Sequence, residues 1–478
     1  MIAAIIALAL AGAPAQLKVR LTQPDGGQVV ALPLEQYVAG VLGGESGVFR
    51  SEEALKAQAV AARTYALRLR GRHSSEGFDF CATTHCQRVN LGAVTPRLQS
   101  AAEETAGELL WFEGQLAFAS YSGDCGGKTE DARAVWPNLV APYLASHPDP
   151  YCARSGATTW RWIASGHQIA AALARSNLRA PHDIERIVIS SRTAAGRART
   201  LSLSGDGQQV QISAGSFRLA LGRGIGWDTL HNDLYEVALE GGRFVFQGSG
   251  AGHGVGLCQR GAEQMGVDGR SYREILAFYY PGTAVGLTAR GLAWLRFGGE
   301  SITVLATQAD WGRAVLADSE RLARALAERT RLALPASIEI RIYPDVDTFR
   351  NATGEPGWVA ARTAGARIHL QPVSILRQRG VLDNTLRHEL IHVLIEHRAR
   401  PGLPVWFREG LADYFEHPAG GSASSLNPDE AGIRQREDAA RARRANAEAA
   451  RRVTALVNRF GEATVLSWLD RGLPPEAR

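Results

Sequence analysis

The pattern of hydrophobic and polar positions predicts strands and then helices in the N-terminal part of this 478-residue chain. Residues 17–32 alternate around a Pro-Asp-Gly-Gly segment at 24–27, which predicts two strands joined by a hairpin turn. Residues 34–42 and 52–67 follow helical spacing, and Ser51 precedes the second run as a helix N-cap. Because alanine lines much of this second helix, we expect another element to pack closely against it.

Short β-rich segments and longer helical ones follow through the rest of the chain. Strands are expected within residues 186–245, where turns separate runs such as 200–203 and 210–212. The Arg-, Ala- and Glu-rich residues 430–452 predict a solvated amphipathic helix that carries no chemistry. This mixture, in a chain too long for one typical core, predicts an α+β protein with more than one domain.

Composition and the first residues favour export from the cell. Residues 1–10 form a short apolar run that ends in a small-Pro-small segment, so residues 1–15 are expected to be a signal peptide. Five cysteines suit an oxidising compartment, and a pI near 9.0 suits an anionic cell envelope, either periplasmic or cell-wall associated. The 53 basic residues include three lysines and form no patch interleaved with aromatic residues, so no nucleic-acid partner is expected.

The most specific chemical motif is His-Glu-Leu-Ile-His at residues 388–392, within an otherwise apolar helical run. Positions i and i+4 share a helix face, so His388 and His392 are able to bind one metal ion. Glu389 then lies beside the open position of the metal, where it polarises a bound water. The alternative is an ordinary amphipathic helix with two surface histidines.

A carboxylate that completes this site follows a proline-rich turn. Glu409 opens a second short helix, and Asp413 lies one turn later on the same face. Two histidines and one carboxylate leave the fourth position of zinc for water, which is typical of a catalytic site. The sequence therefore predicts His388, His392 and Glu409 as ligands of Zn²⁺, with Asp413 orienting a ligand histidine.

The C-terminal part resembles a family of metallopeptidases. Upstream of the metal motif, the resemblance rests on Ile342-Tyr343-Pro344, Phe349, Gly357-Trp358-Val359 and Ala366-Arg367-Ile368-His369-Leu370. With the motif itself, these pieces resemble the peptidase MA-like group of gluzincins over residues 300–420. The resemblance implies an α+β zincin-type domain at 291–478 with C-terminal helices, a peptide or protein substrate, and Glu389 as the catalytic base.

Several collinear motifs follow the two N-terminal helices. They lie at residues 81–87, 122–130, 135–144, 252–262 and 275–283. Together with the helices, they resemble the stage II sporulation protein D / LytB amidase-enhancer family over residues 17–285. The resemblance implies a domain at 16–290 that acts on peptidoglycan glycan strands, as a lytic transglycosylase or as an enhancer of a cell-wall amidase.

The same resemblance places the catalytic glutamate of the family at Glu45, the end of the first helix. Glycan cleavage needs a carboxylic acid whose pKa is raised by an apolar pocket. The group then acts as a base on the 6-hydroxyl of the sugar, so one carboxyl suffices. Ser46-Gly47 stand where the family has an apolar residue and a proline, and the alternative is a solvent-facing acid at a helix end.

Cys81, His85 and Cys86 lie close together in the sequence, and the resemblance adds His73 upstream of them. Sulfur and imidazole at this spacing suit a closed structural zinc site. A Cys81–Cys86 disulfide is the alternative in an oxidising compartment.

Two further features lie within the motifs. Cys125 and Cys152 flank a loop and are expected to form a disulfide, which leaves Cys258 over. The glycine-rich residues 248–256 are expected to present His253 to a sugar cleft, and the alternative is a structural histidine.

These features predict an exported cell-envelope protein with a peptidoglycan-directed module followed by a zinc peptidase module. The alternative is a first module without catalytic activity, which binds glycan and either stimulates an amidase or anchors the peptidase at the wall.

Overall fold

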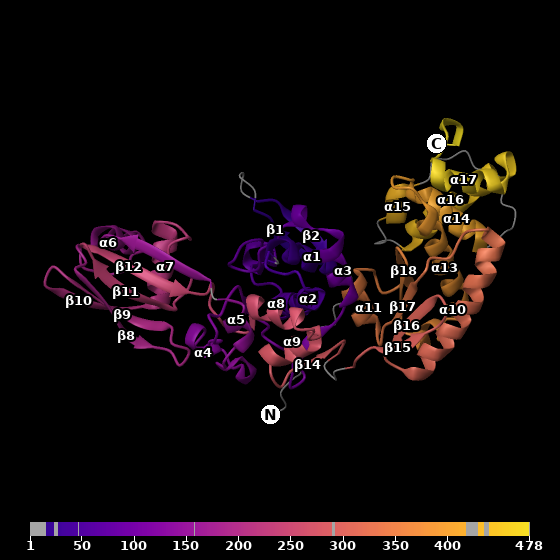
Figure 1. Ribbon diagram of the computed structural model, residues 1–478. Helices are drawn as coiled ribbons and strands as arrows, with labels where there is room; N and C mark the ends of the chain where they lie inside the picture. The colour runs from indigo at the N-terminus through magenta and orange to yellow at the C-terminus, as the bar shows by residue number, and fades with distance from the viewer. Residues whose placement is uncertain are drawn as a thin grey trace, which may run out of the picture. The chain divides into compact units, whose positions relative to one another are not determined.

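The computed structural model contains two compact units, residues 17–291 and residues 292–478. The expected signal peptide, most of the expected hairpin turn at 24–27, and Ser46 lie outside the described residues. Within the described part, strands and helices are mixed in both units (Figure 1), so the predicted α+β, multidomain class is confirmed. The structure describes residues 16–22, 27–45, 47–156, 158–288, 292–416, 429–434 and 439–477.

The first core of the N-terminal unit is built around α2, most of whose side chains are buried. The side chain of Ser51 accepts a hydrogen bond from the N–H of Ala54, as expected of an N-cap. Other helices, α1, α3, α8 and α9, pack against α2, because its small alanine side chains allow close approach. The elements of this core are β1 (Gln16–Arg20), β2 (Val29–Pro33), α1 (Leu34–Glu45), α2 (Glu52–Arg68), β3 (Phe80–Cys81), α3 (Pro96–Glu104), β4 (Leu109–Phe112), β5 (Gln115–Leu116), β6 (Tyr121–Ser122), α4 (Ala132–Val135), α5 (Pro150–Arg154), β13 (Leu257–Cys258), α8 (Gln259–Val267), α9 (Tyr272–Tyr279) and β14 (Ala284–Gly286).

Residues 159–249 form a lobe with a hydrophobic core of its own, between α5 and the glycine-rich loop. It contains two antiparallel sheets of three strands, in the orders β10-β9-β8 and β11-β12-β7. The strands expected at 200–203 and 210–212 are confirmed, within β9 and β10. The elements of the lobe are β7 (Thr159–Ala164), α6 (Gly166–Arg175), β8 (Arg186–Arg192), β9 (Ala198–Gly205), β10 (Gln208–Ser213), α7 (Ala214–Gly224), β11 (Tyr235–Glu240) and β12 (Arg243–Ser249).

The C-terminal unit has a five-stranded sheet in the order β15-β16-β17-β19-β18. Three central strands are parallel, while β15 and β18 are antiparallel strands at the two edges. Helix α13 packs against β18, α10 and α14. The elements are β15 (Leu295–Gly298), β16 (Ile302–Ala306), α10 (Ala309–Thr330), β17 (Ile338–Ile342), α11 (Val346–Thr353), β18 (Ala361–Ala364), β19 (Arg367–Leu370), α12 (Val373–Gln378), α13 (Leu382–Arg398), α14 (Val405–Glu416), α15 (Glu430–Arg434), α16 (Ala439–Phe460) and α17 (Glu462–Arg471).

The prediction of a solvated amphipathic helix at residues 430–452 is confirmed in part, because α16 is amphipathic but its apolar face is buried. The range contains α15 and the first part of α16, and α16 packs against α14. Ala445, Ala449 and Val453 recur every four residues and form a buried apolar stripe.

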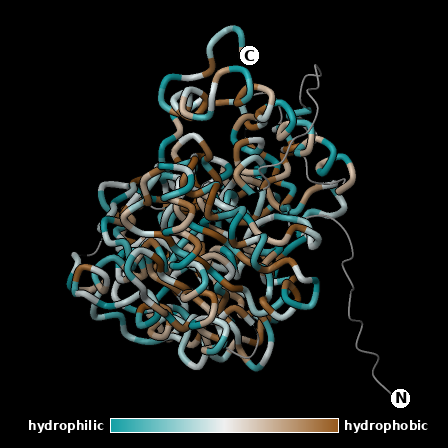
Figure 2. The backbone as a smooth tube through the Cα atoms, turned by 90° about the vertical axis from the view of Figure 1, so that its right-hand side faces the viewer, coloured by the Kyte–Doolittle hydropathy of each residue, from teal (hydrophilic) through white to brown (hydrophobic). Residues whose placement is uncertain are grey.

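Along the tube of Figure 2, hydrophobic and hydrophilic residues are interspersed. None of the described helices is both long and apolar enough to cross a membrane.

Candidate functional site

Helix α13 places two histidines at the edge of a cleft in the C-terminal unit. The Nε2 atoms of His388 and His392 lie 3.1 Å apart, as i and i+4 spacing on one helix face allows. Leu386, Leu390 and the other apolar residues of the helix are buried in the core, which anchors the histidines. The cleft has a volume of about 880 Å³.

Helix α14 brings Glu409 to the histidines. Its Oε2 atom lies 3.3 Å from Nε2 of His392, and one ligand atom from each of the three residues lies within 4.8 Å of the others. Zinc bonds of about 2.0–2.1 Å in a tetrahedron place neighbouring ligand atoms about 3.4 Å apart. The donor set and its spacing therefore fit a zinc ion with a fourth position left for water.

Glu416, which the sequence analysis did not single out, is the closest carboxylate to the outer nitrogen of His388. Nδ1 of His388 lies 2.9 Å from Oε2 of Glu416 and 3.5 Å from Oδ1 of Asp413, the partner expected from the sequence. Burial disfavours the imidazolium, but the hydrogen bond to Glu416 and the nearby carboxylates outweigh it and raise the pKa of His388 to about 9. A divalent cation is able to replace a proton held by so much negative charge.

Glu389 is held from β18. The hydroxyl of Thr363 donates a hydrogen bond of 2.6 Å to Oε2 of Glu389, which is 8% exposed. Thr363 belongs to β18, the edge strand that borders the cleft. The same strand therefore orients the carboxylate of Glu389 and offers a surface along which a ligand is able to lie.

Glu45 is the last residue of α1, where glycines let this helix contact the segment after Cys86. A Cβ atom on Gly44 would lie 2.3 Å from the carbonyl oxygen of Arg88, so only glycine permits this approach. The N–H of Arg88 donates a hydrogen bond of 3.0 Å to Oε1 of Glu45. Burial raises the pKa of Glu45, and the hydrogen bond and charge of Arg88 oppose this only in part.

Gln87 links two tyrosines that interact electrostatically with Glu45. The hydroxyl of Tyr37 donates to Oε1 of Gln87 at 2.7 Å, and Nε2 of Gln87 donates to the hydroxyl of Tyr121 at 3.0 Å. Burial raises the pKa of both tyrosines well above the usual value, and the charge of Glu45 adds to the effect. Glu45 therefore has uncharged hydroxyl groups in its surroundings.

His253 lies in the glycine-rich loop, between two glycines with φ of 86° and 75°. Its Nδ1 accepts a hydrogen bond of 3.0 Å from the N–H of Val255, which leaves the proton on Nε2. Burial lowers the pKa of His253 to about 4, and its ring contacts Trp136 with centroids 5.1 Å apart. The hydrogen bonds of His253 and Glu45 go to different backbone amides, and no described contact joins the two side chains.

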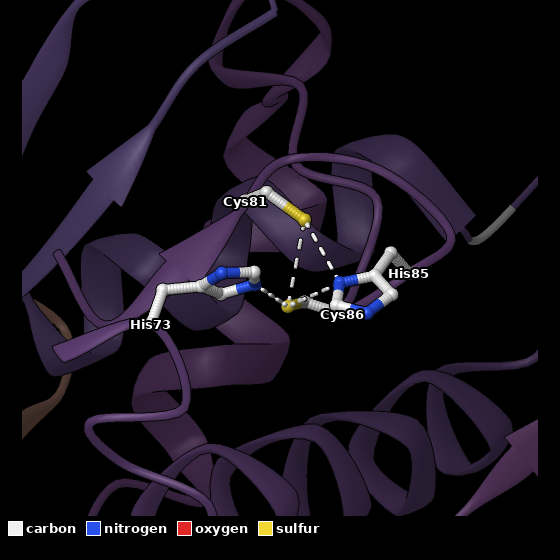
Figure 3. Close-up of side chains that lie close together, drawn as sticks. All are labelled: His73, Cys81, His85 and Cys86. Carbon is white, nitrogen blue, oxygen red and sulfur yellow. Dashed lines mark hydrogen bonds between the residues drawn. The ribbon is translucent and has the colours of Figure 1, made fainter. Parts of the chain in front are cut away.

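His73, Cys81, His85 and Cys86 point toward one another (Figure 3). The two sulfur atoms lie 3.5 Å apart, Nε2 of His73 lies 3.3 Å from the sulfur of Cys86, and Nδ1 of His85 lies 3.6 Å from each sulfur. A disulfide needs about 2.05 Å, and both cysteines are free. These distances fit four ligands around one zinc ion, and the carboxylate of Glu76, 2.6 Å from Nδ1 of His73, orients that ring.

The disulfide expected between Cys125 and Cys152 is not formed in the structure. Both are buried free thiols. The physical reason is that β13 brings Cys258 to the same place, so three sulfur atoms and Asp149 share one cluster.

Comparisons with known proteins concern the N-terminal unit. A family model described as stage II sporulation protein matches residues 23–112, and one described as a domain of unknown function matches residues 152–256. An uncharacterized protein of Brachyspira hyodysenteriae is 31% identical over 256 residues, which cover 53% of this chain and 67% of that protein. Stage II sporulation protein D of Bacillus amyloliquefaciens is 27% identical over 274 residues, with 53% of this chain and 74% of that protein covered.

The amidase enhancer of Bacillus subtilis is 30% identical over 288 residues. The match covers 52% of this chain but 40% of the enhancer, so the chain spans less than half of that relative. The N-terminal part of this chain contains a stage II sporulation protein domain and is similar to stage II sporulation protein D and to the amidase enhancer, as its motifs predicted.

Sequence reasoning missed several residues of these sites. Glu416 stands seven residues after Glu409 on one helix, so a helical-face argument extended by one turn finds it. Thr363, Arg88 and Asp149 reach their sites through tertiary packing, and no local pattern in the sequence marks them.

Proposed function

We propose that this protein is an exported cell-envelope enzyme that cleaves peptidoglycan glycan strands with its first unit and hydrolyses peptide bonds with its second. The observation that supports the peptidase is the convergence of His388, His392 and Glu409, with Glu389 beside them, in one cleft. Similarity to the stage II sporulation protein family and the raised pKa of the half-buried Glu45 support the glycan-directed activity.

In the second unit, zinc held by His388, His392 and Glu409 would supply a bound water whose pKa is lowered to about 7. Glu389 accepts a proton from the attacking water, and the hydroxyl of Thr363 keeps the carboxylate aimed at it. The carboxylate of Glu416 accepts a hydrogen bond from Nδ1 of His388, which leaves Nε2 as the nitrogen available to the metal.

The substrate of this unit is an extended peptide. Strand β18 is an edge of the described sheet, and all four of its residues line the cleft. An edge strand offers backbone N–H and C=O groups to which an extended chain adds as a further strand. A peptide bound in this way passes directly beside Glu389.

Zinc analysis and peptide hydrolysis test the peptidase. The purified full chain should lose about one equivalent of zinc in His392→Ala. Glu389→Gln should retain the metal but lose hydrolysis of a peptide library, because binding of the metal needs no base. Glu328→Gln, on the exposed part of α10, is the matched control. Unchanged zinc content in His392→Ala would end this assignment.

In the first unit, Glu45 acts as the acid and then as the base. Its raised pKa keeps the carboxyl protonated at higher pH, so that it donates a proton to the scissile glycosidic oxygen. The resulting carboxylate takes the proton of the 6-hydroxyl of the sugar, and this oxygen attacks the anomeric carbon to give a 1,6-anhydro end. The N–H of Arg88 holds the carboxylate in place throughout.

The cysteine–histidine cluster supports Glu45. Arg88 follows two residues after Cys86, so a zinc ion bound by His73, Cys81, His85 and Cys86 would fix the segment whose amide holds Glu45. Four protein ligands leave no open position, so this site would be structural.

Digestion of peptidoglycan whose stem peptides have been removed tests the glycan-directed activity, because the peptidase has no substrate there. The full chain should release products with anhydro ends, detected by mass spectrometry, and Glu45→Gln should lose about 10²–10⁴-fold in rate. Glu113→Gln, in an exposed turn, is the control. Binding without cleavage by the unmodified protein would overturn catalysis and favour a glycan-binding amidase enhancer.

A further inference from the structure

Three cysteines that are far apart in the sequence meet in the interior of the first unit. Cys125 follows β6, Cys152 lies in α5, and Cys258 directly precedes α8. All three are 0% exposed, as is Asp149. One ligand atom from each of these four residues lies within 4.8 Å of the others. Three sulfurs and one carboxylate oxygen are donors typical of a site for a thiophilic metal.

Backbone donors surround the sulfur of Cys258. The N–H of Cys125 donates to it at 3.2 Å, and the N–H of Gly261 at 3.5 Å. Both bonds stabilise a thiolate, which is the form of cysteine that binds metal. The position of the sulfur at the N-terminus of α8 adds to this effect, because the helix dipole favours negative charge there.

The carboxylate of Asp149 is fixed against the three sulfurs. Its Oδ1 accepts the N–H of Cys152 at 2.9 Å, and its Oδ2 accepts the hydroxyl of Tyr279 at 2.8 Å and lies 3.3 Å from the sulfur of Cys125. A Cβ on Gly261 would lie 2.5 Å from Oδ2, so glycine at this position makes room for the carboxylate. Hydrogen bonds that orient a carboxylate in this way accompany metal-binding side chains.

An ion pair between Asp124 and Arg260 borders the cluster at Cys152. The sulfur of Cys152 lies 3.1 Å from Oδ1 of Asp124, and Nε of Arg260 lies 3.2 Å from the other oxygen of this carboxylate. The guanidinium of Arg260 compensates the charge of Asp124, so this second carboxylate adds little net charge beside the sulfurs.

We propose that Cys125, Cys152, Cys258 and Asp149 bind a metal ion, and that zinc is the ion these donors favour. Zinc–sulfur bonds of about 2.3 Å in a tetrahedron place neighbouring ligand atoms about 3.5–3.8 Å apart, within the observed spread. Binding releases the thiol protons to solvent, leaves every sulfur in its reduced state and needs no oxidant. With four protein ligands and complete burial, the site has no open position and is structural.

The site lies at the base of the glycine-rich loop. Asp124, next to Cys125, forms a β-bridge with Ala251 of this loop, and the guanidinium of Arg197 donates to the carbonyl of Cys125 at 2.7 Å. A bound metal therefore ties α5 and α8 to the loop that carries His253 and to the lobe that contains Arg197.

A variant that lacks both other candidate metal centres, Cys86→Ser with His392→Ala, isolates this site. The full-length variant should retain about one zinc after dialysis, with a sulfur-rich zinc X-ray absorption spectrum. Adding Cys258→Ser should remove this zinc. Should that protein fail to fold, the milder Asp149→Asn keeps all three sulfurs and should weaken retention of zinc against a chelator by about 10–100-fold.

Two results would overturn the proposal. One is a folded background variant, as judged by circular dichroism, that contains no zinc when purified with zinc present. The other is a Cys125–Cys152 cross-link in non-reducing peptide maps of the unmodified protein, because a disulfide consumes two of the ligands.

Discussion

Replacement of Gly44 by alanine tests whether the contact of α1 with the segment after Cys86 holds Glu45 in place. A Cβ at this position would lie 2.3 Å from the carbonyl oxygen of Arg88 and 2.7 Å from its carbonyl carbon. Both are backbone atoms, so no side-chain rotation relieves the clash. The two segments have to separate by about 1 Å to restore ordinary contact.

Overpacking of this kind costs about 1–3 kcal/mol, and the better helix propensity of alanine returns at most about 1 kcal/mol. We therefore expect the free energy of unfolding of the first unit to fall by about 1–2 kcal/mol. Amides of α1 that exchange through global opening should then exchange about 5–30-fold faster, as measured by hydrogen–deuterium exchange with mass spectrometry. Glycan cleavage should slow as well, because the N–H of Arg88 moves away from Glu45.

Gly47→Ala is the control, since no atom lies within 4 Å of a Cβ there. Its stability should change by less than about 0.5 kcal/mol. Equal protection of α1 in the two variants would refute the packing argument. Lost protection in Gly44→Ala with unchanged cleavage would refute the link to Glu45.

The remaining predictions concern both candidate active sites. In a competition with a chelator, Glu416→Gln should lower the affinity for zinc by about 10–100-fold, and by more than Asp413→Asn does, because Glu416 lies closer to His388. A larger effect of Asp413→Asn would contradict the geometry. Thr363→Val should slow peptide hydrolysis by about 10–100-fold at unchanged zinc content, and loss of the metal as well would contradict a role confined to the base. Cys86→Ser should slow glycan cleavage and accelerate exchange of amides at residues 81–90; unchanged exchange would separate the metal cluster from the catalytic segment. Glycan cleavage should decline as the pH rises through the raised pKa of Glu45, because only the protonated carboxyl donates a proton, and a rate independent of pH would argue against this role.

Sites whose residues lie close together in the sequence were accessible to prediction. His388, Glu389 and His392 share one helix, and His85 and Cys86 lie in the turn that follows Cys81 at the end of β3, so local geometry brings the side chains of each group together. The roles of these residues stay predictions until metal and activity are measured.

Sites assembled from distant segments were not accessible in this way. The expected Cys125–Cys152 disulfide considered two cysteines on either side of a loop, while the fold also brings Cys258 to them after the whole lobe of residues 159–249. The packing of α16 was missed because its many arginines concealed a stripe of alanines one helical turn apart.

The sequence by itself determined several of the helices and strands, the mixed α+β class and the similarity of the N-terminal part to the stage II sporulation protein family, because hydrophobic periodicity, N-caps and short motifs act over a few residues. Only the tertiary structure decided which partner completes each site: Glu416 closer than Asp413 to His388, the amide of Arg88 on Glu45, and Thr363 on the catalytic base. These contacts depend on how helices and strands pack across long stretches of chain, and a glycine or an edge strand at the point of contact sets the distance.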